Sequence, residues 1–221
     1  MATDVMVRTL VDALAERLQA QIVSGELAPG ARVTEQSIAS QYDVARPTAK
    51  AAIERVVQSG LLRRSANKTA SVPELTAIEI KDIYRTRLFF EWSIVKVLAE
   101  RGIAPAEARG ALFDMRRALD DEVLADAVDA DVRFHTALVR AAGSPRTTRM
   151  YETLIGEVRL CMAQERTTSE FQPFPNLKSH EEILDAINAR DVEESRRLIR
   201  GHFVDATARL LNDSLDLVGW I

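Results

Sequence analysis

Apolar residues recur every three or four positions along most of this 221-residue chain, a spacing that places them on one face of a helix. In the first third of the chain, the pattern predicts helices at residues 5–24, 35–42 and 46–60. The segment LLRRSANKTASV, residues 61–72, instead has the pattern of a strand, a polar turn and a second strand.

Helix-start and helix-stop residues support these elements. Thr34 can cap the second helix, Pro47 lies in the first turn of the third, and Gly60 closes it. A short helix, a tight turn, a second helix and a hairpin follow one another in the winged helix-turn-helix fold. We therefore expect residues 1–73 to form such a DNA-binding domain, with three helices and a small β-hairpin wing.

The rest of the chain has the helical pattern alone. Thr76 and Glu79 form a capping box that opens a long helix ending at Gly102. A second capping box begins at Asp191. The chain is therefore expected to be mainly α, with residues 76–221 folding as an all-helical bundle. Turn and proline segments separate the further predicted helices, at residues 105–121, 124–142, 145–168, 177–189 and 192–212.

The amino-acid composition indicates the cellular compartment of the protein. Cys161 is the only cysteine, so no internal disulfide can form and a reducing cytoplasm is expected. No apolar run approaches the roughly 18–20 residues of a membrane span. The N-terminus lacks the compact apolar core and cleavage site of a signal peptide. We expect a cytoplasmic protein with no membrane contact.

The net charge of −4 hides an asymmetry along the chain. Residues 1–75 carry nine Lys/Arg and eight Asp/Glu, whereas residues 76–221 carry 20 and 25. Within residues 43–70, six basic residues stand against two acidic ones. A modest basic patch therefore coincides with the predicted recognition helix and wing.

The third predicted helix has the residue types that a major-groove reader needs. Arg46 and Thr48 lie at its leading end, and Lys50 follows Arg46 by one turn. The alternative is a small helical domain whose basic residues are merely solvated. The residues that flank the predicted wing turn, where DNA phosphates would be met, are Arg63, Arg64, Asn67 and Lys68.

Residues 22–62 resemble the N-terminal domain of GntR-family transcriptional regulators. The resemblance implies that the protein binds double-stranded operator DNA through Gln36, Arg46, Thr48 and Lys50, with Asn67 and Lys68 in the wing. The matching positions are Gly25, Leu27, Pro29, Gly30, Ala39, Val44, Arg46, Gly60 and Leu61.

The chain departs from the family pattern at several DNA-facing positions. Ala45 replaces a Ser or Thr, Lys50 replaces an Arg and so loses bidentate geometry, and Ala51 replaces a Glu. The wing glycine is also absent. These departures bear on which operator is read more than on the fold.

In the second part of the chain, Asp131 and His135 are four residues apart, so both lie on one face of a predicted helix. Apolar residues continue that face, which points it toward the bundle interior. A buried, unpaired carboxylate is costly, and a cation beside it removes that cost.

The two other histidines are placed symmetrically. His180 and His202 each lie 11 residues from Asp191, where the last two helices turn. Antiparallel helices rising about 1.5 Å per residue bring both imidazoles to the same height. One Asp and three His make a ligand set suited to Zn²⁺, Ni²⁺, Mn²⁺ or Fe²⁺. The alternative is three separate core histidines, each hydrogen-bonded on its own.

Residues 79–210 resemble the FadR-type C-terminal ligand-binding (FCD) domain found behind GntR-type winged helices. The matching segments include DVRFHTALVRAAGS, SHEEILDAINARD and RGHF. In the metal-binding branch of that family, an Asp and a His four residues apart and two later His hold a divalent metal. The resemblance assigns those roles to Asp131, His135, His180 and His202, with zinc the expected ion.

The resemblance also implies a small carboxylate effector bound beside the metal. A basic residue of the first bundle helix assists in the family, and Arg87 occupies the matching position. The alternative for Arg87 is an intrahelical pair with Glu91. Arg159 is a second, weaker candidate.

Together these features predict a ligand-responsive DNA-binding regulator, expected to be a repressor and a homodimer, because two recognition helices must meet two half-sites. The competing hypothesis is a helical-bundle metalloenzyme that uses a metal-bound water. The sequence supplies no clear general base or nucleophile for such an enzyme. A third hypothesis is a structural metal that only staples the bundle.

Overall fold

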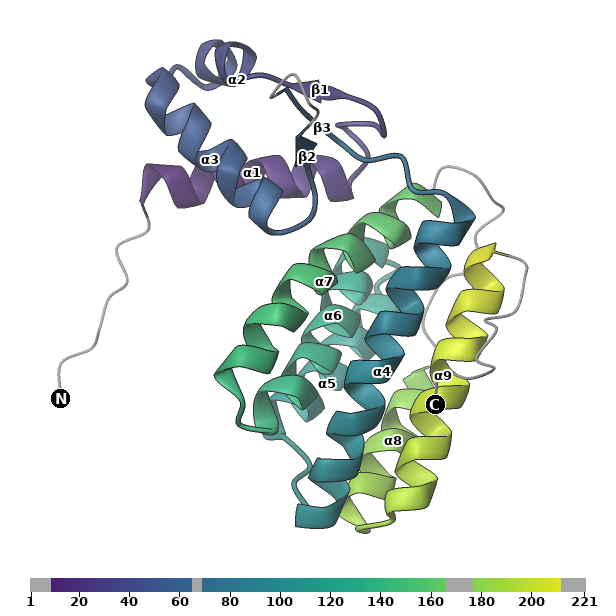
Figure 1. Cartoon of the computed structure of the whole chain (residues 1–221). Coiled ribbons are helices and arrows are strands. Elements are labelled where there is room, and N and C mark those ends of the chain that lie inside the picture. The colour runs from purple at the N-terminus through teal and green to yellow at the C-terminus, as the bar shows by residue number, and fades with distance from the viewer. Residues whose placement is uncertain (1–8, 65–68, 166–176, 212–221) are drawn as a thin grey trace, which may run out of the picture. The chain divides into compact units, whose positions relative to one another are not determined.

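The computed structural model describes residues 9–64, 69–165 and 177–211, and the chain divides into two compact units, Met1–Glu74 and Leu75–Ile221 (Figure 1). Each unit has its own set of elements. The described elements of the first unit are α1 (Leu10–Val23), β1 (Arg32–Val33), α2 (Glu35–Tyr42), α3 (Arg46–Gln58), β2 (Arg63–Arg64) and β3 (Ala70–Ser71).

The small sheet of the first unit is antiparallel, with β3 between β1 and β2. The predicted hairpin is confirmed as β2 and β3. The strand β1 was not predicted, because two residues are too few to show the alternation of a strand. The core of this unit forms where α1 packs against α3. Its fully buried side chains include Leu18, Ile22, Ile53, Val56 and Leu61.

The N-terminal boundary of α1 differs from the prediction. The Thr9 side chain accepts a hydrogen bond from the backbone N–H of Asp12, and the Asp12 carboxylate accepts one from the backbone N–H of Thr9. This capping box satisfies orphan donors of the first turn, so α1 begins at Leu10 rather than at residue 5. Thr34 caps α2 as predicted.

The second unit is a bundle of helices, and the predicted helix positions are confirmed to within a few residues, except that the predicted ends at residues 168 and 212 lie outside the described residues. The capping box of Thr76 and Glu79 is present, and Gly102 ends α4 with a φ of 66°, a left-handed conformation that favours glycine. The bounds of its helices are α4 (Ala77–Arg101), α5 (Ala106–Asp120), α6 (Leu124–Ala141), α7 (Pro145–Glu165), α8 (Leu177–Asn188) and α9 (Val192–Leu211).

The second predicted capping box is only half formed. Asp191 accepts from the backbone N–H of Glu194 at 2.9 Å, but the Glu194 carboxylate pairs with Arg197. The backbone N–H of Asp191 instead donates to Ala186 in the turn that ends α8. The tight α8–α9 turn thus uses the donor that a full capping box would need.

The helix α4 organises the bundle, because it contacts α6, α7, α8 and α9 (Figure 1). Its buried face carries polar residues as well as apolar ones: Arg87 and Glu91 are 1% and 0% exposed. These two charged side chains point into the same interior that α6, α8 and α9 line. None of the helices within the described residues is both long and apolar enough to cross a membrane.

Candidate functional site

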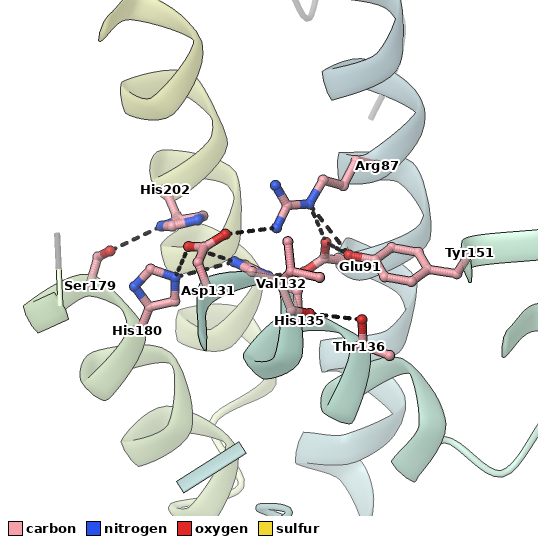
Figure 2. Close-up of polar contacts among 10 residues, drawn as sticks. All are labelled: Arg87, Glu91, Asp131, Val132, His135, Thr136, Tyr151, Ser179, His180 and His202. Atoms are coloured by element: carbon pink, nitrogen blue, oxygen red, sulfur yellow. Dashed lines mark hydrogen bonds and ion pairs between the residues drawn. The ribbon is translucent and has the colours of Figure 1, made fainter. Parts of the chain in front are cut away.

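The four predicted ligands meet inside the second unit (Figure 2). Asp131 and His135 come from α6, His180 from α8 and His202 from α9, and none is more than 5% exposed. The His180 Nε2 atom lies 3.0 Å from Asp131 Oδ1 and 3.2 Å from His135 Nε2. The structure therefore brings together residues that are up to 71 positions apart in the chain.

Helix geometry explains why these residues converge. The four-residue spacing of Asp131 and His135 puts both on the inner face of α6. The turn at Asp191 sends α9 back along α8, so the rings of His180 and His202 lie edge to face with centroids 4.4 Å apart. Phe134 closes one side, with its ring 4.7 Å from that of His180.

A layer of polar side chains surrounds the ligands. The Ser179 hydroxyl lies 3.0 Å from His202 Nδ1, and Glu91 Oε2 lies 2.5 Å from His135 Nδ1. Tyr151, on α7, donates its hydroxyl to the other oxygen of Glu91. Sequence reasoning missed Ser179 and Tyr151 and treated Glu91 only as a partner for Arg87. The available signal was a charged residue in the buried stripe of α4.

Arg87 makes the intrahelical pair with Glu91 that was considered for it, and it also faces Asp131. Its Nε donates to Glu91 Oε1 at 2.9 Å, and its Nη2 lies 3.7 Å from Asp131 Oδ2. Arg87 Nη2 and Asp131 Oδ2 are buried without a hydrogen-bond partner among the described residues. The site thus contains one donor and one acceptor with unused capacity, both next to the histidines.

Burial and neighbouring charge set the protonation states. Burial lowers the pKa of His202, and the nearby His180 and His135 lower it further. Burial and Arg87 likewise lower the pKa of His135. For Asp131 and Glu91, burial opposes ionisation, but the basic groups around each carboxyl outweigh it and the pKa of each falls below its usual range. Neutral imidazoles and ionised carboxylates are the forms that bind metals.

This chemistry fits a divalent cation. In the form that binds a metal, with neutral imidazoles and ionised carboxylates, Glu91 and Asp131 against the guanidinium of Arg87 give this buried site one net negative charge. The four ligand atoms lie within 4.8 Å of one another. Zinc–ligand bonds of about 2.0–2.2 Å allow about 4.4 Å between two ligands of one ion. Asp131, His135, His180 and His202 could therefore hold one metal after small shifts.

Arg159 is not brought to this cluster. It binds Asp129 at 2.6 Å, and Asp129 lies on a different face of α6 from Asp131. Arg159 lines a groove of α5, α6 and α7 in which Arg133 and Arg140 are also paired with carboxylates. An effector role for Arg159 at the histidine cluster has no geometric support here.

The predicted DNA-reading residues occupy the surface of the first unit. Arg46 and Lys50 are exposed on α3, Thr48 is half-buried beside them, and Gln36 is exposed on α2. Arg46 donates to Gln36 at 3.1 Å, which joins the two helices of the helix-turn-helix. Asn67 and Lys68, predicted for the wing, lie outside the described residues.

Not every cation of the basic patch is available for DNA. Arg55 pairs with Asp12 of α1, and Arg64 binds Glu54 of α3 at 2.5 Å. Lys50, by contrast, has no hydrogen-bond or ion-pair partner within the described part of the chain. The leading end of α3 therefore offers the exposed charge.

Comparisons with known proteins agree with this division of the chain. Residues 10–72 match the family described as "Bacterial regulatory proteins, gntR family", and residues 82–205 match the FCD domain. The HTH-type transcriptional regulator BphR of Paraburkholderia xenovorans is 30% identical over 89% of this chain and 83% of its own length. The transcriptional repressor NanR of Klebsiella aerogenes is 27% identical over 94% and 88%.

Solved structures show the same architecture. A putative GntR transcriptional regulator from Rhodococcus sp. RHA1 superposes with a TM-score of 0.76 at 27% identity, covering 91% of this chain and 97% of its own. The matches are to regulators of transcription, which sets aside the metalloenzyme alternative. The chain belongs to the GntR family of bacterial regulatory proteins and is a DNA-binding transcription regulator with a C-terminal FCD domain.

Proposed function

We propose that this regulator is a metal-dependent sensor of a small carboxylate, with zinc held by Asp131, His135, His180 and His202. The observation that carries the proposal is the convergence of four buried ligand atoms within 4.8 Å. When bound, the ion would supply a Lewis-acidic site for an effector carboxylate.

Arg87 would bind the effector carboxylate beside the metal. Its buried Nη2 has no hydrogen-bond partner among the described residues and lies beside Asp131. A guanidinium donor with unused capacity is suited to a carboxylate oxygen. The proposed effector is therefore an organic acid that meets the metal and Arg87 together.

The first unit would bind the operator DNA. Gln36, Arg46, Thr48 and Lys50 would contact operator DNA, with Asn67 and Lys68 in the wing. A homodimer would place two recognition helices in half-sites about one helical turn apart. We propose a cytoplasmic repressor, since several relatives that span most of this chain, including the NanR proteins, are named repressors.

The test is a thermal-unfolding screen of acetate, lactate and succinate against zinc-loaded and chelated protein. A carboxylate present at about 100 times its Kd stabilises by about 2.7 kcal/mol, a shift of several degrees in Tm. We expect such a shift in the zinc-loaded protein alone. Equal shifts in both forms would mean that the metal is not part of the effector site.

The burial of all four ligands also favours a second candidate function, a structural metal that joins α6, α8 and α9. The same samples separate the two. A structural metal predicts that chelation removes the helical circular-dichroism signal and that no carboxylate shifts the Tm. A sensor predicts a folded apo protein whose carboxylate response returns with zinc.

A further inference from the structure

Glu91, on α4, lies between His135 on α6 and Tyr151 on α7, and its two carboxylate oxygens have different partners (Figure 2). Oε2 lies 2.5 Å from the Nδ1 atom of His135 on α6. Oε1 accepts from Arg87 Nε at 2.9 Å and from the Tyr151 hydroxyl on α7. Glu91 is 0% exposed, so these bonds are shielded from bulk water.

These contacts fix the direction of the bond to His135. A guanidinium and a hydroxyl both donate to Oε1, as they would to an ionised carboxylate. The buried ion pair with Arg87 favours the ionised form of Glu91, which can only accept, so His135 Nδ1 carries the hydrogen. The lone pair of His135 is then on Nε2, the atom that lies 3.2 Å from His180 Nε2 and 3.8 Å from Asp131 Oδ1.

We infer that Glu91 is a positioning residue of the metal centre, because it holds His135 in the tautomer whose Nε2 is free to bind the ion. The inference rests on the proposed metal site. Metal-bound histidines commonly donate their second ring N–H to a carboxylate, which fixes the ring and raises its basicity. Here Arg87 and Tyr151 anchor the carboxylate, so that its other oxygen faces His135.

The partner of His202 provides a contrast. Its Nδ1 faces the Ser179 hydroxyl at 3.0 Å, and a hydroxyl can either donate or accept. Ser179 therefore does not impose one tautomer. The Glu91 carboxylate, which can only accept, does select one tautomer for His135.

The first test needs no mutation. ¹⁵N-histidine NMR of the full chain, with one equivalent of zinc and without zinc, reports which ring nitrogen carries hydrogen and which binds metal. We expect His135 to bind through Nε2 with Nδ1 protonated. Zinc on Nδ1 of His135, or a protonated Nε2 in the loaded protein, would overturn the inference.

The second test changes the carboxylate. Glu91→Gln keeps the side-chain volume but replaces one acceptor with a donor, and we expect zinc affinity to fall about 10–100-fold in a chelator competition. Glu100→Gln, on the same helix, loses only a surface pair with Lys96 and should bind zinc like wild type. Tyr151→Phe removes one anchor of Glu91 and should give a smaller loss.

The outcomes separate this inference from the proposed function. If His180→Ala loses zinc while Glu91→Gln keeps wild-type affinity and an Nε2-bound His135, the metal site stands and the role of Glu91 fails. If His180→Ala keeps full affinity, the metal site itself fails. Should Glu91→Gln not fold, the wild-type tautomer and Tyr151→Phe still decide the question.

Discussion

The two units of this regulator place their charged residues in opposite environments. In the first unit, Arg46 and Lys50 are exposed at the leading end of α3. In the second, Arg87, Glu91 and Asp131 are each at most 2% exposed. An exposed cation can meet a DNA phosphate without a fixed partner in its own chain, whereas a buried charge requires one. Substitutions of the charged residues should therefore change DNA binding without changing stability in the first unit, whereas in the second unit they should also change stability.

The largest expected effect is on DNA binding. Replacing both Arg46 and Lys50 by Ala should weaken binding by about 2–6 kcal/mol, since each base or phosphate contact is worth about 1–3 kcal/mol. The measurement is fluorescence anisotropy with a duplex that the wild-type protein selects from a random pool. The Tm and zinc content of the variant should stay unchanged. Wild-type affinity would remove the DNA-contact assignment.

Replacing Arg87 should show the opposite behaviour. Arg87→Met leaves the Glu91 and Asp131 carboxylates buried without their guanidinium, and losing one partner of a buried pair costs about 3–5 kcal/mol. Urea unfolding of metal-free protein measures this cost. The control is Arg140→Met, which breaks an exposed pair with Glu152 and should cost less than about 1 kcal/mol. Similar costs for both variants would contradict the contrast between the environments.

Ligand removal comes next in size. Since even second-layer partners change metal affinity about 10–100-fold, His135→Ala or His180→Ala should weaken zinc binding by more than about 100-fold. Competition with a chromophoric chelator gives the value. Full zinc occupancy in either variant would refute the four-residue ligand set.

The smallest effect concerns a helix cap in the first unit. The N-cap of α3 is Ala45, which makes no side-chain hydrogen bond. Ala45→Ser supplies an acceptor for an orphan backbone N–H and should stabilise the unit by about 1 kcal/mol. Ala51→Ser, in the interior of the same helix, should be neutral or slightly destabilising. Chemical unfolding followed by circular dichroism compares them, and equal effects would rule out capping.

The sequence was sufficient for most of the fold. Capping residues such as Thr76 and breakers such as Gly102 lie at element ends, where their chemistry is local and visible in the sequence. The start of α1 was misplaced because Thr9 and Asp12 were not recognised as a capping box. The strand β1 was not predicted because its two residues are recognisable as a strand only through their pairing with β3, far along the chain.

The part of the candidate site that helical spacing determines could be predicted from the sequence. Asp131 and His135 share a face by spacing, and the symmetric placement of His180 and His202 about Asp191 brought their rings together. Glu91 could not be linked to His135 in this way, because the contact crosses from α4 to α6 over 44 positions. No local sequence pattern predicts a contact between residues so far apart in the chain. The contact of Tyr151 on α7 with Glu91 could not be predicted for the same reason.

The most direct test of the central claim is zinc K-edge X-ray absorption on protein loaded with one equivalent of zinc. One ion held by Asp131 and the three histidines predicts a first shell of nitrogen and oxygen only, with the outer-shell scattering of three imidazoles. A sulfur ligand, which would implicate Cys161, or scattering from no more than one imidazole would contradict the account.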